Sequence, residues 1–377
     1  MEIRILTGCY YPQVHPRAFR AKELAEEFTR QGHHVEVINT TTIEGFDYKK
    51  YTKATGIDIF NLGINKTKID NSIQKETKFT QSFLGHALRG TAQYLLHGSF
   101  FKQASIIIPI LNRLEGADMV MALSTPFVCL YSLSKYVEKH GKHFVTIADS
   151  GDPFYYSKQS KKAIWFKYIE RRVYRSFDYL AIPTETAIPL YLPLIPKEKI
   201  KIIPQGFNMR NLNIYRGELS SPIKFAYAGV FYWDIRNPEF LFAYLNKVTA
   251  DYKFYIIMRY EDALVDKLLD KYPNVKNHVV LKYALPHDDL LYELSTMHFL
   301  VNIENISNTQ LPSKLIDYGI SGRPIFSCKK DSFSEDKFYS FMNGNYEGAM
   351  DIDVRKYDVE VLAKQFIELT EKAKHNG

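Results

Sequence analysis

The sequence predicts an α/β protein built from two doubly wound parallel-sheet domains that face a cleft. Its length of 377 residues suits two domains of ordinary size better than one core. Short buried strands alternate with amphipathic helices along most of the chain, and such units form right-handed parallel crossovers. Near 204–222 this periodicity lapses and Gly, Asn and Ser cluster, which marks a domain boundary.

The first half alternates strand and helix in order. A strand is predicted over 3–6 and a helix over 19–31, which ends at Gly32. Further strands are predicted at 35–38, 119–123, 144–148, 179–182 and 200–203, with helices at 130–140 and 163–177. The segment 48–113 is polar and rich in Lys at first and then mostly helical, and we interpret it as an insertion.

The second half repeats the alternation. Strands are predicted at 224–228, 253–258, 279–281, 298–303 and 324–327, with helices at 237–249, 263–271, 288–296 and 356–374. We therefore assign 1–205 to an N-terminal domain with an insertion around 48–113, 206–345 to a C-terminal domain, and 346–377 to a C-terminal segment with a closing helix. Sheets of this kind bind ligands at the carboxyl ends of their strands.

Composition limits the class of protein. With 46% hydrophobic and 24% charged residues, the chain is globular rather than disordered. Three widely spaced cysteines predict neither a disulfide framework nor a metal site and fit a reducing cytoplasm. The first residues run directly into a strand and the longest apolar runs are short, so we expect neither a signal peptide nor a membrane span. The expected location is the cytoplasm, with peripheral attachment at the inner face of the membrane as an option.

Charge is shared unevenly between the two halves. Residues 1–207 carry a net charge of +9 and residues 208–377 a net charge of −2, which together give the +7 of the chain. A basic half attracts an anionic partner such as a membrane surface, a phosphorylated lipid or a nucleic acid. Nucleic acid is disfavoured, because the aromatics lack an RNA-binding pattern and the cations are scattered. The basic and aromatic helix 158–175 either docks on an anionic membrane or packs its aromatics on the sheet.

The stretch 304–324 is the most informative motif. It is interpreted as a loop that opens into a short helix with Ser313 as its cap, Asp317 one turn further on, and Gly319 among the residues that end it. A helix start suits a phosphate, and a carboxylate one turn into the helix can reach ribose hydroxyls. The motif therefore predicts a nucleotide site. The alternative is an ordinary strand–helix junction with a capping Ser and a surface Asp.

Five stretches together resemble the Rossmann-like, GT-B nucleotide-sugar glycosyltransferases, specifically the GT4-like retaining family (glycosyl transferases group 1). They are 8–12 with 17–20, 145–153, 201–208, 227–232 with 236–238, and 311–324, the last matching the family's donor helix closely. The resemblance implies a C-terminal helix that returns to the first domain and sugar transfer from a nucleoside diphosphate sugar. It also implies a glycan or polyprenyl-diphosphate-linked acceptor, a role in surface polysaccharide assembly, and no need for a metal or another cofactor.

Site residues follow from matching positions in this motif set. For the donor, Asp317 would hold the ribose and the backbone around Gln310, Leu311 and Ser313 the diphosphate. Lys314 would either add charge there or face water. Arg236 would stabilise charge on the leaving group, and Arg259 is a weaker candidate of the same kind.

On the acceptor side, Asp149 either orients a hydroxyl or the donor sugar, or caps the following turn, with Asp152 as its competitor. His15 is a candidate base in a loop.

The chain lacks a charged residue of the family pattern at two positions, and it has Asp317 in place of a family Glu and Arg236 in place of a family Lys. Thr309 stands where the family has a sugar-contacting Glu, a role that Glu304 could take over, and Val230 stands where the family has an Arg. These changes leave a second function open, which is a catalytically degenerate module that binds a nucleotide sugar or glycan without turnover.

Overall fold

The computed structural model describes residues 1–13, 15–68, 97–155, 162–210, 212–233, 236–304 and 313–375, without the side chains of 65–68 and Ser313. The chain forms two compact units. The first comprises Met1–Asn208 and Tyr357–Gly377, and the second comprises Met209–Lys356. The sequence divides the chain at 205/206 and 345/346, whereas the unit boundaries fall at 208/209 and 356/357, which is 3 and 11 residues further along.

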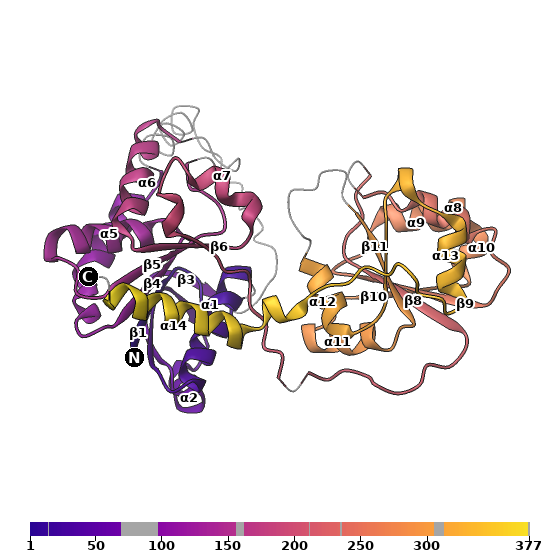
Figure 1. The fold of residues 1–377 in the computed structure, drawn as a ribbon, viewed down its shortest axis with the longest axis horizontal. Coiled ribbons are helices and arrows are strands. Elements are labelled where there is room, and N and C mark those ends of the chain that lie inside the picture. The colour runs from indigo at the N-terminus through magenta and orange to yellow at the C-terminus, as the bar shows by residue number, and fades with distance from the viewer. Residues whose placement is uncertain are drawn as a thin grey trace. The chain divides into compact units, whose positions relative to one another are not determined.

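The first unit is built on a seven-stranded parallel sheet in the order β3-β2-β1-β4-β5-β6-β7 (Figure 1). Its strands are β1 (Glu2–Thr7), β2 (His34–Glu44), β3 (Asp58–Lys68), β4 (Met119–Leu123), β5 (Val145–Asp149), β6 (Tyr179–Ile182) and β7 (Ile200–Ile202). The order reverses between β1 and β4, where successive crossovers leave the sheet in opposite directions. Loops diverge at such a switch point and leave room for a ligand.

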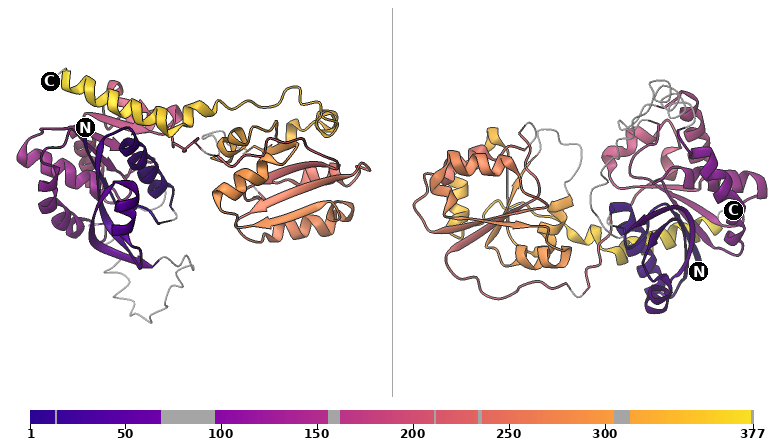
Figure 2. Two further views of the ribbon diagram at one scale, coloured as in Figure 1. Left: turned by 90° about the horizontal axis from the view of Figure 1, so that it is seen from below. Right: turned by 180° about the vertical axis from the view of Figure 1, so that it is seen from behind.

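Both faces of this sheet are covered by helices because its strands are apolar on both sides. On one face, α1 (Pro16–Arg30) packs beside α14 (Val359–His375), the helix that returns from the C-terminus (Figures 1 and 2).

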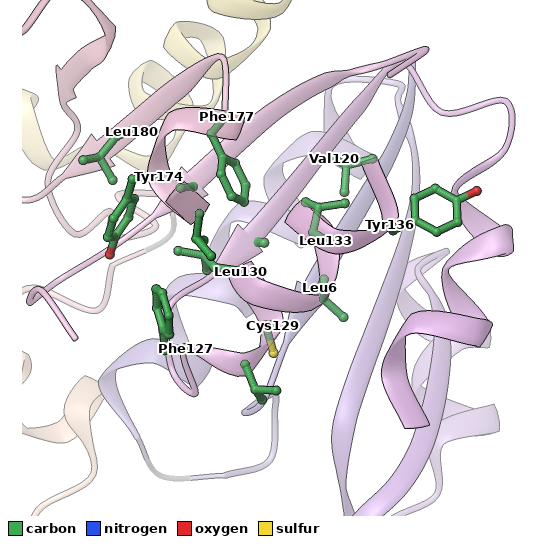
Figure 3. Close-up of a cluster of buried hydrophobic side chains, with 14 of the residues drawn as sticks. Leu6, Val120, Phe127, Cys129, Leu130, Leu133, Tyr136, Tyr174, Phe177 and Leu180 are labelled. Atoms are coloured by element: carbon green, nitrogen blue, oxygen red, sulfur yellow. The ribbon is translucent and has the colours of Figure 1, made fainter. Parts of the chain in front are cut away.

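The other face carries α4 (Phe100–Ile107), α5 (Val128–His140) and α6 (Trp165–Ser176). Their buried side chains include Leu130 and Tyr174, and Phe127 just before α5 joins the same cluster (Figure 3). The short elements of this unit are α2 (Tyr48–Thr55), η1 (Ile108–Leu114), η2 (Glu185–Ala187), α7 (Ile188–Tyr191) and η3 (Lys197–Lys199).

The second unit has a five-stranded parallel sheet in the order β10-β9-β8-β11-β12. Its strands are β8 (Ile223–Ala228), β9 (Tyr252–Met258), β10 (Val279–Tyr283), β11 (Phe299–Ile303) and β12 (Ile325–Cys328). The helices α8 (Glu239–Leu245), α9 (Ala263–Lys271), α10 (Pro273–Lys276) and α13 (Glu335–Met342) cover one face, and α11 (His287–Ser295) and α12 (Ser313–Ser321) cover the other. Two further turns are η4 (Lys330–Ser332) and η5 (Val354–Tyr357). Here the order reverses between β8 and β11.

These sheets confirm the predicted fold class of two doubly wound α/β units with a returning C-terminal helix. The strands β4 and β6 and the helix α9 have the predicted bounds. Two details of the prediction were wrong. The interpretation of 48–113 as an insertion missed β3, which pairs in parallel with β2 as the edge strand of the sheet.

The second error concerns the end of α12. Gly319 lies inside this helix rather than at its end. A Cβ at this position would stand 2.6 Å from Val354 Cγ1, so the glycine is explained by close packing against the 352–354 segment.

Candidate functional site

Each unit has its candidate site at the switch point of its own sheet. In the first unit, a pocket of about 450 Å³ opens beyond the carboxyl ends of β1, β4 and β5. Its lining comes from the loops after these strands and from the start of α1, with His97 and Lys162 completing it. The lining residues are His15, Pro16, Arg17, His97, Ser124, Thr125, Pro126, Phe127, Gly151, Asp152, Pro153, Phe154 and Lys162.

Asp149 lies beneath this pocket rather than in its lining. It ends β5 and its side chain is 1% exposed. Arg20 Nε donates to Oδ2 over 2.7 Å, and Arg17 Nη2 donates to Oδ1 and, over 2.6 Å, to the backbone oxygen. Burial by itself raises the pKa of the Asp149 carboxyl, but the two guanidinium groups outweigh burial and leave this pKa lowered. Asp149 is therefore an ionised anchor that fixes Arg17 in the pocket wall.

The first loop approaches the pocket because of Gly8. The backbone N–H of Gly8 donates to the Thr125 carbonyl over 3.3 Å, and a Cβ on Gly8 would lie 1.8 Å from Pro126 Cδ. Only glycine allows the loops after β1 and β4 to pack so closely.

The predicted residues His15 and Asp152 both line this pocket. His15 is the N-cap of α1, and its Nδ1 accepts the backbone N–H of Arg17 over 3.1 Å. Partial burial, with the Arg17 charge as a second cause, lowers the pKa of His15, which favours the neutral imidazole. Asp152 is exposed, whereas Asp149 is not. Of the two competing carboxylates, the structure brings Asp152 to the pocket.

A buried acid and a buried lysine lie next to Phe154 of the pocket lining. Glu170 accepts the backbone N–H groups of Phe154 and Tyr155, and burial raises the pKa of its carboxyl to about 7. Lys162 is 8% exposed, and its Nζ lies 4.7 Å from the centroid of the Phe154 ring. Burial lowers the pKa of Lys162, while the nearby Glu170 opposes this change.

In the second unit, a cationic group of side chains surrounds the end of β8. Arg236 Nη1 lies 3.2 Å from the hydroxyl of Tyr227 and 3.3 Å from the Val230 carbonyl. Lys314, at the start of α12, places its Nζ 4.2 Å from the centroid of the Tyr227 ring. A Cβ on Gly229 would lie 3.8 Å from both Arg236 Nη1 and Lys314 Cδ, so these two cationic side chains flank the same glycine.

Among the residues that the structure describes, the ammonium group of Lys314 is buried without an anion. The residue is 9% exposed, and within the described ranges no acceptor lies in hydrogen-bond distance of its Nζ. Burial lowers the pKa of Lys314 well below its usual value, and the charge of Arg236 adds to this effect. A buried cation of this kind is costly unless an anion accompanies it. The arrangement therefore favours the binding of an anion at this place.

Asp317 has an unexpected neighbour. Its Oδ1 lies 2.9 Å from Nε2 of His287, the first residue of α11, and its side chain is 17% exposed. The helix that carries Asp317 is tied to the sheet by Tyr318, whose hydroxyl accepts the backbone N–H of Ala228 over 2.7 Å. These contacts hold a carboxylate one turn from the start of α12.

The remaining donor-side predictions are spread out. Arg259 is exposed at the end of β9, and Glu304 accepts from Ser327 Oγ over 2.9 Å. Thr309, Gln310 and Leu311 lie outside the described residues, so their proposed contacts stay predictions. Ser313 is the first residue of α12, and its role as the cap stays a prediction.

Three functional candidates emerge only from the structure, namely Arg17 as a pocket residue, Lys162 and His287. The signal for Arg17 was present in the sequence, because Arg17 and Arg20 stand one turn apart at the start of a helix that follows the first strand. His287 has no local signal, since its partner is thirty residues away. In the parts of the chain that the structure describes, no three His, Cys, Asp or Glu side chains come together as metal ligands.

Comparison with known proteins shows the fold. No family model and no curated protein matches the sequence. The chain is similar in structure to a glycosyltransferase from Rickettsia africae, at 12% identity and a TM-score of 0.62, covering 100% of this chain and 99% of that one. It is also similar to a sucrose-phosphate synthase from Thermosynechococcus elongatus, at 11% identity and a TM-score of 0.59 over 100% of both chains.

A third similar structure is the Anabaena protein HepE in complex with UDP. It shows 10% identity and a TM-score of 0.59, over 99% of this chain and 100% of that one. The chain therefore has the GT-B fold of these glycosyltransferases.

Proposed function

We propose that the chain is a retaining glycosyltransferase that moves a sugar from a nucleoside diphosphate sugar to a hydroxyl of a glycan or lipid-linked glycan. The observation that carries the proposal is the pair of Arg236 and the buried Lys314 beside Gly229, at the switch point of the second sheet. Two cations and the start of a helix suit a diphosphate. The UDP complex of the similar Anabaena structure supports a nucleotide at this kind of fold.

Different residues of the second unit would bind the diphosphate, the ribose and the sugar of the donor. Arg236 and Lys314 would bind the diphosphate and stabilise the negative charge that develops on it as the sugar leaves. Asp317, fixed by His287, would accept hydrogen bonds from ribose hydroxyls. The sugar-contacting carboxylate that the family places at the position of Thr309 would have to come from elsewhere, and Glu304 at the end of β11 is the candidate.

The first unit would hold the acceptor in its pocket. Asp152 would orient the attacking hydroxyl, because its carboxylate is exposed in the pocket lining. His15, with its pKa lowered, could accept a proton near neutral pH. Asp149 would act through Arg17 as a positioning residue.

Donor hydrolysis and sugar transfer by Arg236→Ala and Asp317→Ala variants test the site. We expect turnover to fall about 100-fold or more in Arg236→Ala, because a charge-stabilising donor is removed, and about tenfold in Asp317→Ala through weaker nucleotide binding. Lys247→Ala is the matched control, since Lys247 is exposed in a surface ion pair of the same unit. Turnover like that of the wild type in both site variants would contradict the assignment.

The second candidate function is a binding module without turnover, favoured by Thr309 and Val230 at the two positions that lack a charged residue of the family pattern. A thermal-shift screen against several nucleotide sugars, paired with hydrolysis and transfer assays, separates the two functions. Stabilisation by a nucleotide sugar with no product from any acceptor would select the module.

We also propose peripheral binding to the inner face of an anionic membrane, which would suit surface polysaccharide assembly in the cytoplasm. No helix among the described residues is long and apolar enough to span a membrane. In α6, Phe166 and Tyr174 pack on the sheet, while Trp165 and Tyr168 are 40% and 66% exposed beside exposed Lys167. Co-sedimentation with anionic vesicles should fall in a Trp165→Ala/Lys167→Gln variant. Binding that is equal on neutral vesicles would contradict the proposal.

A further inference from the structure

We propose that the pocket of the first unit binds a phosphate-type anion, so that the acceptor is a phosphorylated sugar or a phosphate-linked lipid rather than a neutral sugar. That the ligand of this pocket is an acceptor rests on the proposed function. The anion site depends only on the residues of the pocket.

The pocket contains the cation Arg17, which the buried carboxylate of Asp149 holds in place. Arg17 is 15% exposed at its side chain, and only one of its terminal nitrogens has a described bond to Asp149. Its Nε is buried and finds no acceptor in the described part of the chain. Asp149 is shared with Arg20, so two guanidinium charges face one carboxylate. This cluster keeps an excess of one positive charge at the pocket wall.

A second cation lies in the pocket lining. Lys162 is 8% exposed, and its Nζ lies over the ring of Phe154. The buried Glu170 acts on its charge, and the Glu170 carboxylate also accepts two backbone N–H groups. Among the described lining residues, Asp152 is the one acidic side chain. Cations therefore outnumber carboxylates in the lining.

Two helix starts converge on the same space. The 15 residues of α1 and the 13 residues of α5 both begin at lining residues, Pro16 for α1 and, just before α5, Phe127. Neither helix has an acidic residue in its first turn, where the helix dipole favours one. An anion from outside the chain would occupy the position that Asp or Glu usually takes at a helix start.

The rest of the pocket suits a sugar. Phe127 and Phe154 stack with ring centroids 4.4 Å apart and form an apolar wall. Asp152 supplies an acceptor for a hydroxyl, and the volume of about 450 Å³ lies within the range of small-molecule sites. A sugar ring on the aromatic wall, with its phosphate at Arg17 and Lys162, would use every one of these groups.

Titration with hexose 6-phosphate, unphosphorylated hexose and inorganic phosphate tests the proposal. The titrations are done in a Lys314→Met background, because the second unit also attracts phosphate. We expect hexose 6-phosphate to bind at least about tenfold more tightly than hexose, and Lys162→Met and Arg17→Met each to weaken it about tenfold or more. Lys139→Gln removes an exposed charge from the same unit and should change nothing. Equal binding of the two hexoses, or full affinity in Lys162→Met, overturns the proposal.

Folding is controlled in two ways. Lys162→Met does not disturb the Asp149 cluster, and Arg17→Lys keeps a charge next to Asp149 while removing the forked donors. Partial binding by Arg17→Lys with an unchanged melting temperature supports a direct contact with the anion. A melting temperature that falls in parallel with affinity in all three variants would make the effect structural and would reject the contact.

Two further experiments are needed. One identifies the source of the anion, and the other separates the anion-site proposal from the proposed transferase function. Vesicles with and without polyprenyl phosphate, compared with soluble hexose phosphates, identify a lipid or a free sugar phosphate as the tighter ligand. Binding of hexose 6-phosphate that depends on Arg17 in a protein without donor hydrolysis would leave the anion site standing and reject the transferase. Sugar transfer to neutral sugars that is unchanged by substitution of Arg17 and Lys162 would leave the transferase standing and reject the anion site.

Discussion

The buried cations at the two switch points differ in whether a carboxylate of the chain pairs with them. In the first unit, Arg17 and Arg20 share the buried carboxylate of Asp149, and the lowered pKa of this carboxyl shows that the charges stabilise one another. In the second unit, Lys314 is also buried but has no described acceptor, and Arg236 adds a second positive charge. The first arrangement pairs its charges within the chain, whereas the second has no anion among the described residues.

This difference separates a structural charge from a binding charge. A paired buried ion contributes to the folded state, and breaking the pair is costly. An unpaired buried ion lowers stability, and such strain is typical of sites that bind a ligand of opposite charge. The comparison therefore predicts opposite signs for substitutions at Asp149 and Lys314.

The largest effect is expected for Asp149→Asn. Loss of the carboxylate charge leaves two buried guanidinium groups without an anion and should lower the free energy of unfolding of the first unit by about 3–5 kcal/mol. The chain has two Trp residues, and a Trp233→Phe background leaves Trp165 as a fluorescence reporter of this unit in urea. Lys364→Gln, which breaks an exposed pair of the same unit, should cost no more than about 1 kcal/mol. Equal effects of both substitutions would contradict the structural role of Asp149.

Lys314→Met should have the opposite sign. Removal of the unpaired ammonium group is expected to stabilise the ligand-free second unit by about 1–3 kcal/mol while it weakens diphosphate binding about tenfold or more. A Trp165→Phe background makes Trp233 the reporter. A lower free energy of unfolding in Lys314→Met would show that the lysine is paired in solution.

The same variant has a pH signature. The pKa of Lys314 is lower in the folded state than its usual value of 10.5, so the unfolded state binds more protons between the two values. The stability of the wild type therefore rises with pH in this window. Its deficit relative to Lys314→Met should shrink as the pH approaches 10.5 and be largest below the folded pKa. A difference that does not change with pH would exclude titration of Lys314.

The smallest effect is expected at His287. His287→Ala should weaken nucleotide binding about threefold to tenfold, because Asp317 loses the donor that orients its carboxylate. If the two residues act as a unit, His287→Ala/Asp317→Ala should weaken binding less than the sum of the single effects. Isothermal titration with the nucleoside diphosphate measures this coupling. Strict additivity would mean that His287 acts independently of Asp317.

Much of the fold could be predicted because it depends on local patterns. Buried strands such as β4 and β6 and amphipathic helices such as α9 can be recognised from the spacing of their apolar residues alone. The edge strand β3 was missed because its polar, Lys-containing surroundings dilute the alternation of Phe60, Leu62 and Ile64 that pack on the core. Gly319 was misplaced because a glycine needed for close packing looks, in sequence, like a helix terminator.

The candidate site was predictable only in part. The motif at 311–324 contains Lys314 and Asp317 in sequence, and the helix that it predicts is present as α12. Asp149 lies under the pocket, whereas Asp152 enters it. This difference depends on the direction of the Asp149 side chain at the end of β5 and on Arg17 and Arg20 of α1, which bind it. No spacing in the sequence states this.

The sequence by itself determined the class of the chain, namely alternating α/β units, a boundary near the middle, and an anion-ready helix start in the second half. Only the tertiary structure decided which charges are paired and which are not. Pairing joins residues as distant as Arg17 and Asp149, or His287 and Asp317, and the pKa of a buried group depends on such neighbours and on the water that they exclude. Local periodicity carries no information about either.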